Sequence, residues 1–428
     1  MADFLTAAEA ARRLGVKPAT LYAYVSRGVL TRARAADGRA SLFSADEVDR
    51  LARKGRPRRP AGTLEITVES AITEITADSL HFRGLDATRL AVSRTFEEVA
   101  ELLWTGELRP AAEAWQARPA ALTAGRAAQA ALPAGTLPLE RLQVIVPAMA
   151  ATDPLRLQLD QSAVLAAGRN IVAGMVDCLP PAVGPRQPPP AAGPRQPPPA
   201  AARGASPPDP SAGRSGPVAG RLWDRLCGHR ASPALLRATS AALVLLADHE
   251  LAASTLAARA AASVRADPYA VVGTGLGAVS GALHGGASLG AETLLAAASG
   301  PGDVPRVVAE LLRRGEKVPG FGHFVYRGGD PRATVLLDLV RRAAPKSGQL
   351  AVAEAVLAEV RQKSLPEPNI DFALATLAQV AGMVRGAGEA IFAVSRTAGW
   401  VAHALEAYSG PGPLRPRAVY TGRPATRL

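Results

Sequence analysis

The sequence KVPGFGHFVYRGGDPRA, residues 317–333, interrupts a chain that is otherwise rich in alanine and in helical patterns. Its glycines disfavour a helix and let the backbone turn and approach a ligand closely. His323 therefore lies on a predicted loop, where functional residues are commoner than packing residues. Arg327 and Arg332 follow it and carry planar guanidinium groups suited to carboxylates and phosphates. The stretch predicts an anion-binding site beside a histidine.

Two further histidines lie in comparable settings. His284 stands before two glycines in SGALHGGASLGAETLL, at the predicted start of a helix, where the helix dipole favours a neutral imidazole. His249 lies between two acids in LLADHELAAST. Singly, each histidine is more often a structural residue. Together with Asp371 in EPNIDFALATLAQ, Arg396 in SRTAGW and Arg415 in LRPRAVYTG, they suit a dianionic substrate and acid–base chemistry.

Helical periodicity dominates residues 63–428. FEEVAELLW, DQSAVLAAGRNIVAGMV, SPALLRATSAALVLLADHEL, AVAEAVLAEV and AIFAVSRTAGWVAHALEAY each place an apolar stripe on one helical face. TLEITVESAITEIT, residues 63–76, alternates as a strand does. Residues 183–217 are rich in proline and contain GPRQPPPAA twice, which predicts a disordered insertion. His403, on a helix with Trp400, is expected to be a packing residue. The fold class is therefore mainly α.

The composition limits the classes of protein. The chain has 428 residues, 48% of them hydrophobic, which is enough for two or three domains. It has no long uncharged apolar run and no apolar signal core at its amino terminus. Its cysteines, Cys178 and Cys227, are too few for a disulfide framework and have no further ligands nearby for a metal. We expect a reduced cytoplasmic protein with no membrane segment and no metal.

Residues 1–54 have the pattern of a separate small domain. Thr6 and Glu9 form a predicted capping box at the start of one helix, and Pro18 opens a second helix after a short turn that contains glycine. An Asp-Gly hairpin turn and a Ser-capped helix follow. This order resembles the winged helix-turn-helix of the MerR and excisionase type. Residues 55–62, GRPRRPAG, are the expected linker.

Positive charge is concentrated at the same end of the chain. Residues 1–60 contain 13 lysines and arginines against six acids, which is +7 of the formal net charge of +12. Such an excess in a small terminal segment indicates an anionic partner, and DNA fits the helix-turn-helix pattern. An arginine-rich composition without a binding role is the alternative.

Six motifs together resemble the citrate synthase family. DHELAAST, LHGGAS, GFGHFVYRGGDPRA, PNIDF, SRTAGW and RPRAVYTG occur in the family's order over about residues 63–428. With the amino-terminal helix-turn-helix, the chain resembles a bacterial subgroup of that family. The resemblance implies an almost entirely helical fold of two domains, the smaller at about residues 290–395, that close over the substrate. It also implies at least a homodimer and no cofactor, with acetyl-CoA as a substrate.

The same resemblance implies a role for each candidate residue. Asp371 would remove a methyl proton from acetyl-CoA, His284 would hydrogen-bond the thioester oxygen, and His323 would donate to the ketone oxygen of oxaloacetate. Arg327 would meet the phosphates of CoA. Arg415 would come from the neighbouring subunit. Four residues would hold the two carboxylates of oxaloacetate: His249, Arg332, Arg396 and Arg415.

The sequence leaves three interpretations of function. The first is citrate synthase, an acyltransferase. The second is 2-methylcitrate synthase, which uses propionyl-CoA; one methylene gives a pocket only about 1–3 kcal/mol of discrimination. Phe324 follows His323 where many family members have arginine or alanine, so the acyl substrate stays open. The third is a DNA-binding regulator whose citrate synthase-like body senses a metabolite and has lost turnover. The intact Asp371, His284 and His323 argue against lost turnover, and the basic amino-terminal segment argues for some binding role.

Overall fold

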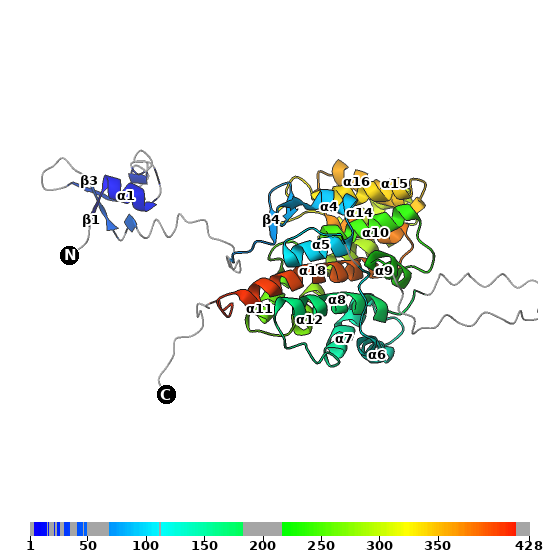
Figure 1. Ribbon diagram of the computed structural model, residues 1–428. Helices are drawn as coiled ribbons and strands as arrows, with labels where there is room; N and C mark the ends of the chain where they lie inside the picture. Colours follow the sequence, from blue (N-terminus) through cyan, green and yellow to red (C-terminus); the bar gives the residue numbers. More distant parts are fainter. Residues whose placement is uncertain are drawn as a thin grey trace, which may run out of the picture. The chain divides into compact units, whose positions relative to one another are not determined.

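The computed structural model describes residues 4–14, 16, 21, 24–25, 30–34, 41–45, 47–48, 68–110, 113–182 and 216–416 (Figure 1). The chain divides into two compact units, Met1–Val68 and Glu69–Leu428, which are taken separately below. The predicted linker and all but the last two residues of the predicted proline-rich insertion lie outside the described residues.

The first unit contains a small sheet and a helix. Its strands pair antiparallel in the order β1-β3-β2, and they are β1 (Phe4–Thr6), β2 (Arg32–Arg34) and β3 (Ser41–Ser44). The helix α1 (Ala7–Leu14) begins at the predicted capping box, in which Thr6 N donates to Glu9 Oε2 at 2.9 Å and Glu9 N to Thr6 Oγ1 at 3.4 Å. Much of the predicted second helix and the Asp-Gly turn lie outside the described residues.

The second unit is mainly helical, as predicted. Its helices are α4 (Ala87–Ser93), α5 (Phe96–Thr105), α6 (Pro119–Ala130), α7 (Pro138–Ala150), α8 (Gln161–Cys178), α9 (Val218–Leu226), α10 (Pro233–Leu246), α11 (Ala253–Ser263), α12 (Pro268–Val279), α13 (Gly286–Ala296), the 3-10 turn η1 (Pro301–Asp303), α14 (Val304–Arg313), α15 (Pro331–Ala343), α16 (Gly348–Gln362), α17 (Ile370–Val380) and α18 (Ala387–Ser409). A small antiparallel sheet accompanies the helices, with the order β4-β5-β6: β4 (Thr73–Ile75), β5 (Leu80–Phe82) and β6 (Leu85–Asp86). The strand predicted over 63–76 is described from residue 68 onward, and in that part the strand is β4 alone.

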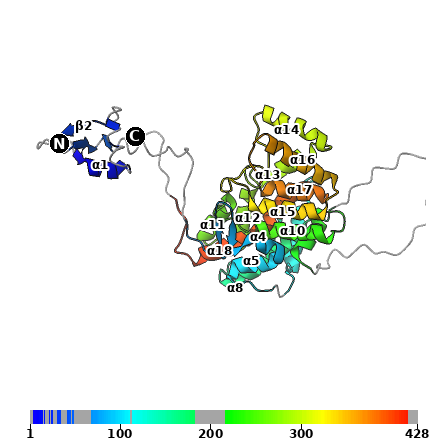
Figure 2. The same ribbon diagram turned by 90° about the horizontal axis from the view of Figure 1, so that it is seen from above.

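The long helix α18 forms the centre of this unit. It is buried from Ala387 to Ala404 and contacts α5, α7, α8, α10, α11 and α12 (Figure 1). An apolar helix that is buried around its whole circumference is typical of the core of a large domain. The helices α13, α14, α16 and α17 gather at one end of the unit (Figure 2). Among the described residues, no helix combines the length and the apolar character that crossing a bilayer requires.

Candidate active site

The loop that carries His323 is joined to the segment just before Asp371. Asn369 N donates to the carbonyl of Gly320 at 2.9 Å, and Asn369 Nδ2 donates to the carbonyl of Gly322 at 2.9 Å. Both glycines have a φ of +82°, in the left-handed region, and a Cβ at Gly320 would lie 2.9 Å from the backbone of α17. Only glycine fits there. The loop glycines of the motif therefore bring the histidine and the carboxylate into one site.

His323 is held as a hydrogen-bond donor toward the site. Its Nδ1 accepts from Val325 N at 3.0 Å and from Tyr326 N at 3.2 Å. Burial, and then the charge of Arg332, lower the pKa of His323 to about 4, so the ring is neutral at pH 7 and carries its one proton on Nε2. Arg332 Nη2 lies 3.4 Å from that nitrogen. With the proton on Nε2, both nitrogens are donors, and an oxygen of a substrate within reach of both would satisfy them.

Arg332 is a buried cation with a buried counter-ion. Asp330 accepts from Arg332 Nε at 2.9 Å and from Nη2 at 2.8 Å, and its Oδ2 also accepts from Ile370 N at 3.0 Å. Burial opposes both charges, but their mutual attraction outweighs it: the pKa of Asp330 lies below its ordinary value and that of Arg332 above. The pair ties the start of α15 to the start of α17. It also fixes the guanidinium plane, as a two-point contact does.

His249 lies against the same group. It is 9% exposed, its Nε2 lies 3.1 Å from the hydroxyl of Tyr326, and its ring is 5.3 Å from that of His323. Burial, followed by the charges of Arg332 and Arg396, lowers the pKa of His249 well below its ordinary value. His249 is therefore a neutral side chain between two cations.

Arg396, on α18, is the second buried cation and is 1% exposed. Its Nε donates to the carbonyl of Leu246 at 2.7 Å, and its guanidinium lies 4.7 Å from the ring centroid of Phe392. Its Nη1 is buried and has no hydrogen-bond partner among the described residues. Burial lowers the pKa of Arg396 to about 10, so it stays charged at neutral pH. A buried donor without a partner is costly, and an anionic substrate would supply the acceptor.

Asp371 is the second residue of α17, and the pKa of its carboxyl lies near neutrality. Burial raises its pKa to about 7, although the charges of Arg332 and Arg396 lower it in part. Its Oδ1 is buried and has no hydrogen-bond partner within the described part of the chain. A carboxylate in this state is suited to general-base chemistry at pH 7 and above.

His284 precedes α13 and contacts the ring of Phe392, as Arg396 does. Its Nε2 lies 2.8 Å from Ser254 Oγ, and its ring packs edge-on against Phe392 at 5.4 Å. Burial first, and then Arg396, lower its pKa to about 4. The predicted neutrality is present, but burial rather than a helix terminus is its main cause.

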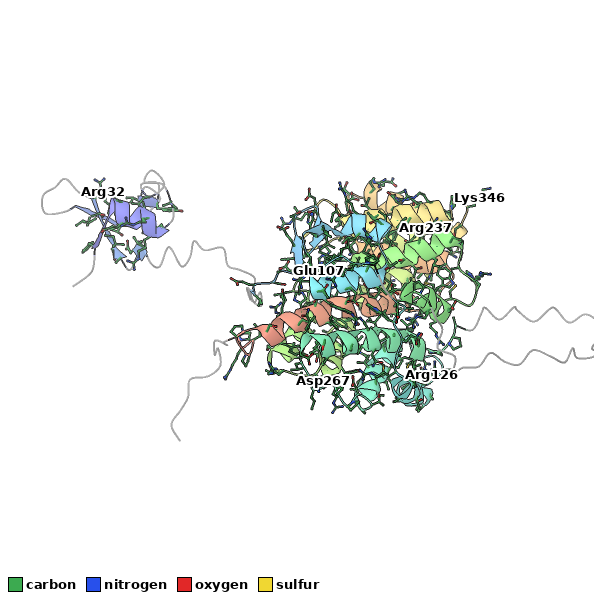
Figure 3. All side chains as sticks on the ribbon, in the orientation of Figure 1. Arg32, Glu107, Arg126, Arg237, Asp267 and Lys346 are labelled. Atoms are coloured by element: carbon green, nitrogen blue, oxygen red, sulfur yellow. The ribbon has the colours of Figure 1, made fainter. Side chains whose placement is uncertain are left out.

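Two predicted residues differ from this group in their exposure. Arg327 and Arg415 are exposed, unlike Arg332 and Arg396. In that respect they resemble Arg237 and Lys346, which lie at the surface of the body (Figure 3). The helix α18 ends at Ser409, about 20 Å along its axis from Arg396, and Arg415 lies in the segment after it.

Sequence reasoning missed a buried network behind His249. Asp248 is fully buried; its Oδ2 accepts from Thr73 Oγ1 at 2.6 Å and lies 3.4 Å from His403 Nε2. His403 Nδ1 accepts from Arg259 Nη1 at 2.9 Å, and Arg259 pairs with Glu406 at 2.7 Å. His403 is thus buried as predicted, but it belongs to a polar chain rather than to apolar packing. No signal in the sequence pairs these residues, because they come from four separate segments.

Two other contributors were also missed. Asp330 was visible as the residue before Pro331 at the start of a helix, a pattern typical of an N-cap, and it caps α15 by accepting from Arg332 N at 3.0 Å. Tyr326 had no signal beyond its place in the motif. Within the described residues, no cluster of histidine, cysteine and carboxylate side chains is arranged to hold a metal ion.

Comparisons with known proteins match two parts of the chain. The family model "Citrate synthase, C-terminal domain" matches residues 63–417, and a helix-turn-helix domain model matches residues 4–56. Citrate synthase 2 of Bacillus subtilis is 38% identical over 204 residues, 46% of this chain and 54% of that protein. This chain therefore spans about half the length of that relative.

Other relatives are covered almost completely. Citrate synthase of Haloferax volcanii is 31% identical over 374 residues, 83% of this chain and 94% of that protein. The 2-methylcitrate synthase of Mycobacterium tuberculosis is 30% identical over 380 residues, 86% and 91% of the two chains. Citrate synthase of Thermoplasma acidophilum, solved as a ternary complex with carboxymethyl coenzyme A and oxaloacetate, has a TM-score of 0.65 at 23% identity and covers 86% of this chain and 96% of that one.

Proposed function

The chain belongs to the citrate synthase family, and on that premise we propose that it condenses acetyl-CoA with oxaloacetate and water to give citrate and CoA. The observation that carries the proposal is Asp371, a half-buried residue whose carboxyl has a pKa of about 7 and a buried Oδ1 without a hydrogen-bond partner among the described residues. It lies among neutral histidines and two buried arginines. A weakly acidic methyl group needs such a base, and the developing enol needs donors that are already in place.

In the proposed reaction, Asp371 takes a proton from the methyl group of acetyl-CoA. His284 stabilises the enol oxygen as a neutral partner, and its pKa of about 4 keeps it uncharged during the step. The nucleophilic carbon then bonds to the ketone carbon of oxaloacetate. Nε2–H of His323 donates a hydrogen bond to the ketone oxygen as negative charge develops on it. That oxygen takes up a proton, which replaces the one lost from the methyl group, and becomes the hydroxyl of citryl-CoA. Water hydrolyses the thioester and releases CoA.

The two carboxylates of oxaloacetate would lie against Arg332, Arg396 and His249. Arg396 Nη1 has no partner among the described residues, and Arg332 Nη2 lies 3.4 Å from His323 Nε2. A dianion would therefore satisfy donors that are already buried and positioned, as oriented binding requires. Arg415 and Arg327 complete the proposed set, the first from a neighbouring subunit in a homodimer and the second at the phosphates of CoA.

A cavity of about 580 Å³ adjoins His323 and suits the remainder of an acyl-CoA. Its apolar lining includes Val318, Phe321, Leu365 and Pro366, and the charged Glu316 and Lys317 also line it. Apolar walls with a few charged groups are typical of sites for small molecules and cofactors.

Turnover is tested by thiol release with oxaloacetate and either acetyl-CoA or propionyl-CoA. A higher kcat/KM with acetyl-CoA supports citrate synthase. A higher value with propionyl-CoA favours the second candidate, 2-methylcitrate synthase, which the Mycobacterium tuberculosis relative brings into consideration. No thiol release with either substrate overturns both.

For the first unit we propose DNA binding in the cytoplasm. The helix-turn-helix match at residues 4–56 and the excess of positive charge in the same region support it. A homodimer would present two such units, as many helix-turn-helix proteins do on paired half-sites. Binding to the promoter region of its own gene, measured at low salt, tests it.

A further inference from the structure

Tyr326 lies at the centre of the candidate site, yet its side chain has no part in the reaction described above. It is 2% exposed. Its ring stacks on the imidazole of His323, with centroids 4.7 Å apart and an interplanar angle of 30°. Its hydroxyl lies 3.1 Å from His249 Nε2, and the guanidinium carbon of Arg332 lies 5.5 Å from its ring centroid. One side chain therefore contacts three groups of the proposed oxaloacetate site.

The hydroxyl of Tyr326 can determine which nitrogen of His249 carries the proton. Burial raises the pKa of Tyr326 to about 12, so the phenol keeps its proton at neutral pH. A neutral imidazole has one N–H and one acceptor nitrogen. When Nε2 of His249 accepts from the phenol, the proton lies on Nδ1 and that nitrogen becomes a donor. The reverse arrangement leaves a lone pair on Nδ1, which repels a carboxylate.

The surroundings favour the first arrangement. A dianionic substrate between Arg332 and Arg396 carries only acceptors on its carboxylates, so each neighbouring group gains by presenting a donor. The phenol also has a single proton to give, and His249 is its one hydrogen-bond partner among the described residues. The tautomer of His249 then matches the charge of the substrate.

The ring of Tyr326 has a separate effect on His323. The backbone N–H groups of Val325 and Tyr326 fix the proton of His323 on Nε2, as shown above, but they leave the tilt of the imidazole free. Stacking at 4.7 Å restricts that tilt. The direction in which Nε2–H points thus depends on an aromatic ring at position 326.

We propose that Tyr326 is a positioning residue with two separable parts: its hydroxyl sets the tautomer of His249 for binding oxaloacetate, and its ring sets the orientation of His323 for catalysis. The proposal rests on the proposed function in naming oxaloacetate as the bound dianion. Loss of the hydroxyl should therefore change KM, and loss of the ring should change kcat. Loss of a purely structural side chain would not separate the two parameters.

Steady-state kinetics on two variants test the division. Tyr326→Phe removes the hydroxyl and keeps the ring, so KM for oxaloacetate should rise about tenfold while kcat stays within about twofold. Tyr326→Leu removes both the hydroxyl and the ring, so kcat should fall a further tenfold or more. A loss of that size is expected when one catalytic hydrogen-bond donor is misoriented. Tyr269→Phe is the matched control. Tyr269 is 1% exposed, and its hydroxyl bonds Asp153 and Asn170 outside the site.

Several kinetic results would overturn the proposal. One is an unchanged KM for oxaloacetate in Tyr326→Phe. Another is a kcat that falls equally in the Phe and Leu variants, because the ring would then have no separate effect. A third is a Tyr269→Phe control that changes KM as much as Tyr326→Phe, since the loss would then reflect general destabilisation.

A second measurement does not depend on turnover. The chain has six histidines, so a protein labelled with ¹⁵N at histidine gives few enough signals to identify each tautomer by NMR. Variants His249→Gln and His323→Gln assign the two signals. We expect an Nδ1–H tautomer for His249 in the wild type, its loss in Tyr326→Phe, and an unchanged Nε2–H tautomer for His323 in both. The same tautomer of His249 in both proteins would refute the proposal, even if the wild type released no thiol and the proposed function had failed.

Discussion

Asp371→Asn is expected to stabilise the folded protein at pH 8 while it abolishes condensation. Burial raises the pKa of Asp371 from its ordinary value of 3.8 to about 7. Each unit corresponds to about 1.4 kcal/mol, so an ionised Asp371 costs the fold about 4 kcal/mol relative to the unfolded chain. Asparagine has a similar shape and carries no charge. It removes that cost, and it also removes the group that accepts the methyl proton.

The expected pH dependence follows from the direction of the pKa shift. Below about pH 4 the carboxyl is protonated in both the folded and the unfolded state, so Asp371 does not lower the free energy of unfolding. As the pH rises from about 4 to about 7, the unfolded chain ionises and the folded chain does not, so the wild type loses stability. Above about pH 8 both states are ionised and the loss is constant. The advantage of the variant should therefore grow between these limits.

The assay is urea unfolding followed by circular dichroism, at pH 5 and at pH 8, on both proteins. The difference in free energy of unfolding should be about 2–3 kcal/mol larger at pH 8 than at pH 5. Glu74→Gln is the control, because Glu74 is an exposed carboxylate on β4 that meets water in both states. Equal differences at the two pH values would refute the argument from burial, and wild-type thiol release by Asp371→Asn would refute the assignment of the base.

Three more predictions concern the remaining parts of the chain. Arg415→Ala and Asp371→Asn proteins should each be nearly inactive, and mixed dimers should regain activity because one of their two sites has both residues intact; formed dimers without rescue would place Arg415 elsewhere. Deletion of residues 184–216 should leave the melting temperature and specific activity nearly unchanged, because loop closure depends weakly on length, and a large loss in either would mean that the segment packs on the body. Deletion of residues 1–60 should keep thiol release and abolish DNA binding; in the intact protein, the logarithm of the binding constant should fall with log salt by about 0.9 per phosphate contact, and a salt-independent affinity would contradict an electrostatic interface.

The helical fold was predictable because it depends on local patterns. Apolar stripes such as that of AIFAVSRTAGWVAHALEAY determine which face of a helix is buried, and α18 is buried over most of its length. The same holds for the glycines of the His323 loop. Gly320 and Gly322 mark a backbone that other residues cannot follow without strain, and the structure pairs that loop with Asn369. Local chemistry was enough in both cases.

The supporting residues were not predictable, because their roles come from contacts between distant segments. Asp248 precedes His249 in the sequence, yet its partners Thr73 and His403 lie 175 and 155 residues away. The close approach that creates this network depends on Gly399, where a Cβ would meet the carbonyl oxygen of Ala247 at 2.6 Å. Sequence spacing carries no information on such a contact. The causes of the pKa shifts were hidden for the same reason, since burial of a side chain is a property of the assembled fold.

The charges of the site also determine how the base responds to its substrate. In the free protein, Arg332 and Arg396 lower the pKa of Asp371, and burial raises it to about 7 in spite of them. A bound dianion places two negative charges beside the same two guanidinium groups. It offsets the attraction that had stabilised the ionised carboxylate, so the pKa of Asp371 rises when oxaloacetate binds. A carboxylate of higher pKa is a stronger base toward a carbon acid. The pH profile of kcat reports the pKa of Asp371 in the bound state, and the profile of kcat/KM for oxaloacetate reports it in the free protein. The lower limb of the kcat profile should therefore lie at higher pH than the lower limb of the kcat/KM profile.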